Sequence, residues 1–212
     1  GTVTGSKHLL THEGRRILID CGLFQGLKNL RELNWAPLPI DPSSIDAIVL
    51  THAHLDHCGY LPRLIADGFE GPVFATPATC DVAELILRDS GYLQEKDADY
   101  ANRKGFTRHS PALPLYDLEQ AEQSLGHFTP TAFDHVTTLP GGAKLVFRRA
   151  GHILGAATAE IEWGGRRIVF SGDLGRYGDG MMVDPEPVER ADYVVIESTY
   201  GDRLHTPGDP IE

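Results

Sequence analysis

Four side chains that bind divalent metal ions lie close together in the sequence: His52, His54, Asp56 and His57. Imidazole nitrogens and carboxylate oxygens are ligands that zinc and similar ions prefer. Because alternate residues of an extended segment point to one side, His52 and His54 can face the same ion. A short loop cannot turn all four side chains toward one tetrahedral ion, so the spacing favours two adjacent ions. The alternative is a polar loop with exposed histidines.

Three further residues could bind metal or support its ligands: Asp20 before this cluster, and His152 and Asp173 after it. His152 comes just after a predicted strand, and Asp173 comes just after another; glycines flank both, which lets the backbone approach a metal closely. Each alone has an ordinary structural interpretation, but together they supply a third imidazole and a carboxylate that can bridge two ions. Asp20, at the end of a predicted hairpin, can hydrogen-bond a ligand. Its alternative role is to cap a turn.

The elements that must position these residues follow from periodicity and turn residues. A hairpin is predicted from Lys7–His12 and Arg16–Asp20, and a buried strand, Ile45–Leu50, runs directly into the histidine cluster. A loop and a short helix are predicted for 22–34. The polar segment 94–109 has weak periodicity, is expected to be exposed, and is compatible with a helix. The remaining predicted helices are Tyr60–Asp67, Thr79–Tyr92 and Asp117–Leu125, and the remaining strands are Pro72–Ala75, Leu145–Arg149, Ala157–Trp163, Arg167–Ser171 and a buried Tyr193–Ile196. Without repeats or linkers, this pattern predicts one α/β unit.

Composition narrows the class of protein. Hydrophobic residues make up 41% and charged residues 23% of the 212 residues, as in globular domains. No apolar run is long enough to span a membrane. The net charge of −11 repels nucleic acid unless cations sit in the site. The three cysteines lack C-x-x-C spacing, which favours a reducing compartment and predicts a cytoplasmic protein.

The H-x-H-x-D-H cluster at His52–His57, followed by His152 and Asp173, resembles the signature of the metallo-β-lactamase superfamily. Other segments resemble its β-CASP group, which contains RNA-processing exo- and endonucleases. These segments are Gly1–Ser6 (GTVTGS), Gly22–Gly26 (GLFQG), Gly151–Gly155 (GHILG) and Glu197–Arg203 (ESTYGDR).

The resemblance implies a four-layer αββα sandwich with a dinuclear metal site at the edge between two sheets. It assigns His52, His54 and His152 to one ion, Asp56 and His57 to the other, and Asp173 to both. The expected metal is zinc, with manganese or iron as alternatives. In that family a metal-bound hydroxide attacks the scissile phosphorus. Three residues are expected to act in catalysis: Asp56, which orients the water, the motif acid Glu197, and Asp20.

The chain departs from the family pattern in one respect. In the family, a cap domain and further histidines follow the segment that contains Glu197; one histidine completes the second metal site and another protonates the leaving group. This chain ends at Glu212. Residues 1–212 are therefore expected to form a partial metallo-β-lactamase-like domain that lacks the β-CASP insertion and the C-terminal remainder. Alone, it is expected to bind fewer than two ions and to be nearly inactive, because leaving-group protonation contributes about 10²–10⁴ in rate.

Three functions are compatible with these sequence features. The first is a metal-dependent nuclease that cleaves single-stranded RNA, with DNA as a variant, in exo- or endonuclease mode. The second is another hydrolase of the superfamily, such as a thioesterase or lactonase. The third is a non-catalytic binding subunit, which the presence of every expected ligand in the covered region disfavours. A homodimer is a further option, and no membrane partner is expected.

The other chemically notable residues have ordinary interpretations. Cys58 is expected to pack as a small apolar residue. The basic side chains Arg31, Arg176 and Arg203 either contact phosphate or are solvated. The remaining histidines, outside every matched motif, are expected at the surface or in loops: His8, His12, His109, His127, His135 and His205.

Overall fold

Two five-stranded sheets stacked face to face form the frame of the computed structural model, which describes residues 4–107 and 109–202. In the first sheet the order is β1-β2-β3-β4-β5, and in the second it is β10-β9-β8-β7-β6. The first sheet consists of β1 (His8–His12), β2 (Arg15–Ile19), β3 (Ala47–Val49), β4 (Val73–Ala75) and β5 (Phe128–Pro130). The second consists of β6 (Thr137–Thr138), β7 (Lys144–Arg149), β8 (Ala157–Trp163), β9 (Arg166–Phe170) and β10 (Tyr193–Val195).

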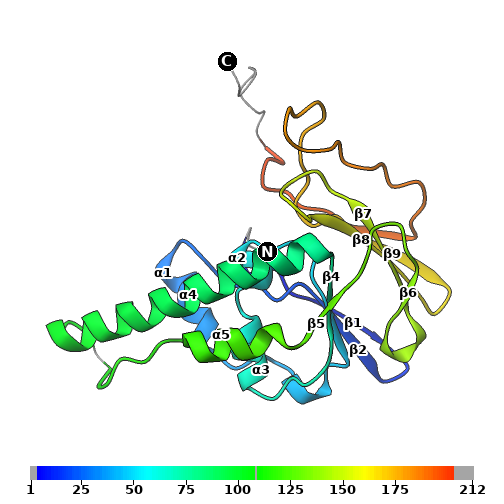
Figure 1. Ribbon diagram of the computed structural model, residues 1–212. Helices are drawn as coiled ribbons and strands as arrows, with labels where there is room; N and C mark the ends of the chain where they lie inside the picture. The colour runs from blue at the N-terminus through cyan, green and yellow to red at the C-terminus, as the bar shows by residue number, and fades with distance from the viewer. Residues whose placement is uncertain (1–3, 108, 203–212) are drawn as a thin grey trace.

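The helices gather on the outer face of the first sheet, and the second sheet lies on its other side (Figure 1). They are α1 (Lys28–Arg31), α2 (Leu55–Cys58), α3 (Leu61–Ala66), α4 (Pro77–Lys104) and α5 (Leu118–Leu125), with short 3₁₀ turns η1 (Glu32–Trp35), η2 (Pro42–Ser44) and η3 (Pro140–Gly142). In the described part of the chain no helix covers the far face of the second sheet. Three of the four layers of the expected αββα sandwich are therefore visible.

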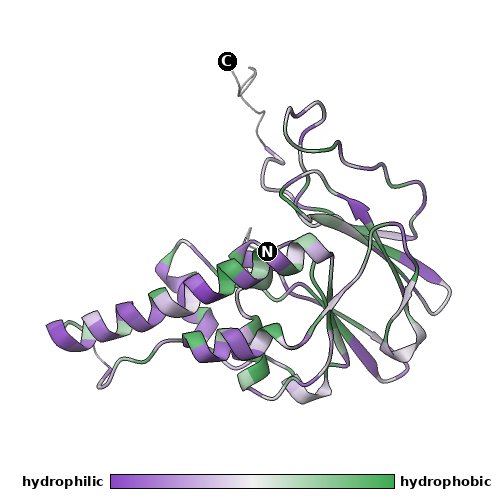
Figure 2. Ribbon diagram, in the orientation of Figure 1, coloured by the Kyte–Doolittle hydropathy of each residue, from purple (hydrophilic) through white to green (hydrophobic). Residues whose placement is uncertain are grey.

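Strand β2 shows why two cores form. Ile17 and Ile19 face the second sheet and pack against residues such as Phe147, whereas Leu18 faces the helices. Both sides of β2 are buried because successive side chains of a strand point to opposite faces and both faces of this sheet are covered. Figure 2 shows hydrophilic residues, by contrast, along the end of α4 that projects away from the sheets.

The predicted hairpin is confirmed: β1 and β2 pair antiparallel, with His8 opposite Ile19. Its turn contains Glu13 and Gly14, which both have positive φ angles. From β2 to β5 the strands are parallel, so each crossover returns the chain to the same edge of the sheet. The predicted strand that precedes the histidine cluster is confirmed as β3, which is fully buried.

Helix α4 is longer than the predicted Thr79–Tyr92. It begins after the N-cap Thr76 and continues to Lys104, where Gly105 adopts a left-handed conformation with φ 65°. The polar segment after residue 93 continues the helix because good helix formers need no apolar stripe to remain helical at the surface. Gly91 lies where α4 packs against α5: a β-carbon there would lie 2.8 Å from the carbonyl oxygen of Asp117.

The strand predicted at Tyr193–Ile196 is confirmed as β10, but the prediction that it is buried is wrong: Tyr193 is 59% and Val194 54% exposed. Among the described strands, β10 pairs only with β9 and lies at the edge of its sheet. The short strands β5 and β6 and the single-turn helix α2 were not predicted from the sequence. No helix in the described part of the chain combines the length and apolar character that a bilayer span requires.

Candidate metal centre

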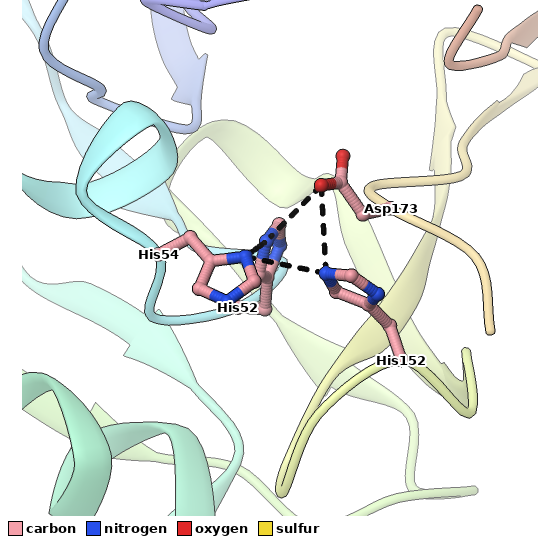
Figure 3. Close-up of side chains that lie close together, drawn as sticks. All are labelled: His52, His54, His152 and Asp173. Carbon is pink, nitrogen blue, oxygen red and sulfur yellow. Dashed lines mark hydrogen bonds and ion pairs between the residues drawn. The ribbon is translucent and has the colours of Figure 1, made fainter. Parts of the chain in front are cut away.

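Four metal-binding side chains converge where the two sheets meet: His52, His54, His152 and Asp173. Their donor atoms all lie within 4.8 Å of one another. His52 and His54 follow β3 of the first sheet, whereas His152 follows β7 and Asp173 follows β9 of the second sheet. Figure 3 shows the three rings and the carboxylate directed toward one another. The stacking of the two sheets therefore assembles a group that neither sheet holds alone.

The distances between these donor atoms fit one small ion. Nδ1 of His54 lies 3.1 Å from Nε2 of His52 and 3.2 Å from Nε2 of His152. Oδ2 of Asp173 lies 3.7 Å from the nitrogen of His52 and 3.5 Å from that of His152. In a tetrahedral zinc site with bonds of about 2.0–2.1 Å, neighbouring donors lie about 3.3 Å apart. The spacing and chemistry of the four donors thus suit a small divalent metal ion.

Asp173 faces two groups of residues at once. While its Oδ2 points to the three histidines, its Oδ1 lies 3.2 Å from Nε2 of His57. On the other side of the His57 ring, Nδ1 donates a hydrogen bond of 2.7 Å to Oδ2 of Asp20. The carboxylate of Asp173 is therefore placed as a bridge between the four-donor group and His57, which is not part of that group.

The pKa values of the histidines in and beside the four-donor group are shifted in opposite directions. Burial, assisted by the neighbouring His57, lowers the pKa of His52 to about 2. Burial also lowers the pKa of His152. For His57 burial again disfavours the charged ring, but the carboxylates of Asp173 and Asp20 outweigh it and raise its pKa to about 10. His52 is thus neutral over the physiological range, as a nitrogen ligand must be.

Asp173 has the complementary shift. Its burial alone would favour the neutral acid, but the hydrogen bond from His57 and the charges of the surrounding histidines lower its pKa to about 2. The side chain is therefore an anion among imidazoles, although it is largely withdrawn from solvent. A buried carboxylate surrounded by nitrogen donors is a favourable environment for a cation.

Asp20 organises the residues behind the site. It is 2% exposed and has a positive φ of 58°, a conformation that is uncommon outside glycine but that aspartate adopts more readily than most residues. Its Oδ1 accepts hydrogen bonds from the backbone N–H of Thr51 at 2.9 Å and from the Thr51 hydroxyl at 3.0 Å. The hydroxyl of Ser6 donates to Oδ2 at 3.3 Å. These bonds support the interpretation of Asp20 as a residue that orients a ligand.

The backbone after Asp20 clamps helix α2. The N–H of Cys21 donates to the carbonyl of His57 at 2.7 Å, and the N–H of Leu23 donates to that of Leu55 at 2.8 Å. At Gly22 a β-carbon would lie only 1.6 Å from the carbonyl oxygen of Asp56. Only glycine allows the two segments to approach this closely, which explains one glycine of the GLFQG segment.

Of the predicted catalytic residues, Glu197 lies beside this group. Oε1 of Glu197 accepts a hydrogen bond of 2.8 Å from the backbone N–H of Leu174, the residue after Asp173. Glu197 also lines a cavity of about 300 Å³ together with Asp20, His57 and Asp173. Asp56 is half-buried in the first turn of α2, outside the four-donor group.

Most other predicted residues lie away from the centre. Cys58 is fully buried, in agreement with its predicted apolar role. His127 is half-buried and donates from Nδ1 to the carbonyl of Gly71 at 3.0 Å. Arg31 and Arg176 are exposed. His8 is exposed but lines the same cavity as Glu197 and Asp173. His109 and His135 are exposed and His12 is half-buried, whereas Arg203, His205 and the first three residues lie outside the described residues.

Three residues that support the site, Ser6, Thr51 and Ser171, were not predicted from the sequence. Ser6 and Thr51 hold Asp20, and the hydroxyl of Ser171 accepts a hydrogen bond of 3.0 Å from the backbone N–H of Glu197. Serine and threonine are common beside strand ends, so their type carries no signal. For Thr51 the one available clue was its position directly before His52, the first residue of the ligand motif.

Three imidazoles and a carboxylate, gathered between two stacked sheets, define a metal-binding α/β sandwich. Comparison with protein families identifies the superfamily. The family model described as "Beta-lactamase superfamily domain" matches residues 15–208, and the chain belongs to this superfamily. Among solved structures, BJP-1, a subclass B3 metallo-β-lactamase of Bradyrhizobium japonicum, matches with a TM-score of 0.53. The match covers 95% of this chain and 75% of that one at 18% identity, and it shows similarity of fold.

Curated relatives are more similar in sequence. Ribonuclease TTHA0252 of Thermus thermophilus is 42% identical over 97% of this chain and 43% of its own length. Transcription termination factor FttA of Methanosarcina mazei is 36% identical over 92% of this chain and 29% of its own. Cleavage and polyadenylation specificity factor 73 of Drosophila melanogaster is 31% identical over 93% of this chain and 27% of its own length. The chain thus spans less than half the length of these relatives. Two of the three names, ribonuclease and cleavage and polyadenylation specificity factor, agree with the predicted resemblance to the RNA-processing β-CASP group.

Proposed function

We propose that this chain is the metal-binding unit of a phosphodiester hydrolase that cleaves single-stranded RNA. The observation that carries the proposal is the convergence of His52, His54, His152 and Asp173 on one point. The RNA substrate is supported by relatives named ribonuclease and cleavage and polyadenylation specificity factor. The proposal assigns the metal-binding unit to residues 1–212 and the location of the protein to the cytoplasm.

The donor set fits zinc in its chemistry as well as its spacing. Three neutral imidazoles and one carboxylate are typical zinc ligands, and the lowered pKa of His52 keeps its lone pair available. Nε2 of His57, once its proton is displaced, and the carboxylate of Asp56 are proposed to form part of a second ion site that this chain alone leaves incomplete, with Asp173 shared between the two sites. Manganese and iron prefer similar ligands, so they are the alternatives to zinc.

A divalent cation bound at this centre supplies Lewis-acid polarisation of a phosphoryl oxygen and lowers the pKa of a water molecule. The residues of the chain then act by holding groups in place. Asp20 fixes the orientation of the His57 ring through the 2.7 Å bond to Nδ1. Asp56 is proposed to orient the attacking water.

Glu197 has a proposed role next to Asp173. Its Oε1 accepts a hydrogen bond from the N–H of Leu174 and so helps to hold the backbone that follows Asp173. Its Oε2 is the proposed partner of a group that protonates the leaving oxygen, because a carboxylate that accepts a hydrogen bond from an imidazole favours the protonated ring.

Charge explains why the centre needs cations to accept RNA. The net charge of −11 repels a polyanion, and Asp20, Asp56, Asp173 and Glu197 concentrate negative charge at the site. Bound divalent ions would reverse the sign of the local field. RNA binding is therefore expected to depend on metal more steeply than binding by a basic protein does.

Cleavage of labelled single-stranded RNA, with the chain in excess over RNA and added zinc or manganese, tests the proposal. We expect slow but metal-dependent cleavage that Asp173→Asn abolishes and Asp134→Asn preserves. Asp134 is a matched control because it accepts from Arg148 and Arg149, away from the centre.

Parallel assays with thioester, lactone and β-lactam substrates separate the alternatives. Efficient thioester or lactone hydrolysis with intact RNA would replace the nuclease with another hydrolase of the superfamily. Metal-dependent RNA binding without any cleavage would indicate the non-catalytic binding subunit instead.

A further inference from the structure

The loop that carries His152 is attached to the first turn of helix α4. The carbonyl oxygen of Gly155 accepts a hydrogen bond of 2.7 Å from the hydroxyl of Thr76 and another of 2.9 Å from the hydroxyl of Thr79. Both threonines are completely buried. The loop connects β7 to β8 in the second sheet, whereas the threonines follow β4 in the first. The two bonds therefore link the two sheets next to the metal centre.

The hydroxyl of Thr76 also lies 3.0 Å from the hydroxyl oxygen of Thr79, so its single proton is shared between Thr79 and Gly155. The hydroxyl of Thr79 donates to Gly155, whose carbonyl has two lone pairs and can receive both hydroxyls. The oxygen of Thr76 remains free to accept the N–H of Thr79 at 3.2 Å, which caps α4. Helix capping thus explains the oxygen of Thr76, but it does not explain why Thr79 is a threonine.

The contact is too close for any residue but glycine at position 155. Gly155 has a φ of 83°, and a β-carbon built on it would lie 2.3 Å from the backbone nitrogen of Thr79. The backbone of the loop therefore rests directly on the backbone of the helix, with no side chain between them.

The loop is short and closed, so fixing one end fixes the other. The N–H of Ala150 donates to the carbonyl of Ala156 at 3.1 Å, and the N–H of Ala156 donates to that of Ile153 at 2.9 Å. His152 lies inside this closed turn, three residues before Gly155. Its Nε2 must stay near Nδ1 of His54, which belongs to the other sheet, 3.2 Å away.

We propose that Thr76 and Thr79 are positioning residues of the metal centre, which set the distance of His152 from the ligands on the first sheet through Gly155. This inference rests on the proposed metal centre. Residues that orient ligands without touching the metal typically change its affinity about 10–100-fold when mutated. The proposal places such residues on a helix that the ligand motifs do not include.

The test uses Thr79→Val, which removes the hydroxyl but keeps the N-cap at Thr76. Thr79→Ser restores the hydroxyl. Ser124→Ala is the matched control, because its buried hydroxyl also donates to a backbone carbonyl, that of Ala121 in α5, at 2.6 Å. The first measurement is amide hydrogen exchange of residues 150–156 in metal-free protein. We expect faster exchange in Thr79→Val only, and unchanged exchange would overturn the proposal.

The second measurement is zinc affinity by chelator competition, with the absorption spectrum of the cobalt-substituted protein as a reporter of ligand geometry. We expect Thr79→Val to bind zinc about 10–100-fold more weakly with an altered cobalt spectrum. Thr79→Ser and Ser124→Ala should match the wild type. Faster exchange with unchanged affinity and spectrum would show a purely structural link and overturn the proposal. A wild-type chain that binds no metal would instead overturn the metal centre itself, whatever the exchange data show.

Discussion

His57 donates a hydrogen bond from Nδ1 to Oδ2 of Asp20 at 2.7 Å, across 37 positions of sequence. The bond determines that Nε2, the other ring nitrogen, faces Asp173. Because Asp20 also accepts from the backbone and hydroxyl of Thr51, the carboxylate ties the end of β2, the end of β3 and helix α2 together. One buried aspartate thus supports both the fold and the orientation of a proposed ligand.

Replacing this carboxylate should weaken metal binding. Asp20→Asn keeps the size of the side chain but removes the charge that holds His57, so we expect zinc affinity to fall about 10–100-fold. Chelator competition measures the change, and Asp41→Asn, at an exposed cap of η2, is the control. Equal affinity in the two variants would show that Asp20 has no influence on the centre.

A methyl group at Gly22 should displace helix α2. Because the β-carbon would meet the carbonyl oxygen of Asp56 at 1.6 Å, we expect Gly22→Ala to reduce the free energy of unfolding by about 3 kcal/mol or more. Gly126→Ala is the matched control, since its β-carbon would have no neighbour nearer than 3.4 Å. Urea unfolding compares the two variants, and equal stabilities would contradict the close contact.

The core between the sheets should be sensitive to truncation. Phe147 is fully buried between them, so Phe147→Ala should lower the free energy of unfolding by about 3–5 kcal/mol. Leu85 is 70% exposed on α4, and Leu85→Ala should change it by no more than about 0.5 kcal/mol. Denaturant titrations followed by circular dichroism decide this, and similar losses in both variants would refute the assigned core.

Asp46 should contribute to acid sensitivity. Burial opposes its ionisation, but bonds from the backbone of Arg16 and the side chain of Arg15 outweigh burial and lower its pKa. A lowered folded-state pKa stabilises the protein above the unfolded value of about 3.9, and this contribution disappears as the pH falls through the folded value.

Asp46→Asn should therefore destabilise the chain by about 1 kcal/mol at pH 6, with a difference that shrinks as the pH falls toward 2. Urea unfolding of the wild type and the variant across this range measures the difference. A difference that stays constant with pH would exclude the ionised carboxylate as its source.

Residue type and spacing were sufficient to select the members of the four-donor group. His52 and His54 are two apart after a buried strand, and this alternation alone indicates a shared direction. His152 and Asp173 follow strands in the same way, and parallel or stacked strands deliver such residues to one edge. The residues behind them, such as Thr76 and Thr79, could not be selected, because their partner carbonyl at Gly155 is more than seventy positions away.

The fold was predictable where local pattern and tertiary burial agree. Strand β3 is apolar and is buried on both sides, as its sequence indicates. The same kind of run in β10 is exposed, because an apolar pattern does not reveal whether a neighbour covers it. Helix α4 extends past Tyr92 because its helix-favouring residues and its terminal Gly105 act without an apolar stripe.

The most direct test of the metal centre is a zinc-soaked crystal of the chain, with anomalous data collected on both sides of the zinc absorption edge. The centre predicts a peak bounded by Nε2 of His52, Nδ1 of His54, Nε2 of His152 and Oδ2 of Asp173, at about 2.0–2.1 Å from each. A map with zinc bound elsewhere, and no peak among these four atoms, would contradict the assignment.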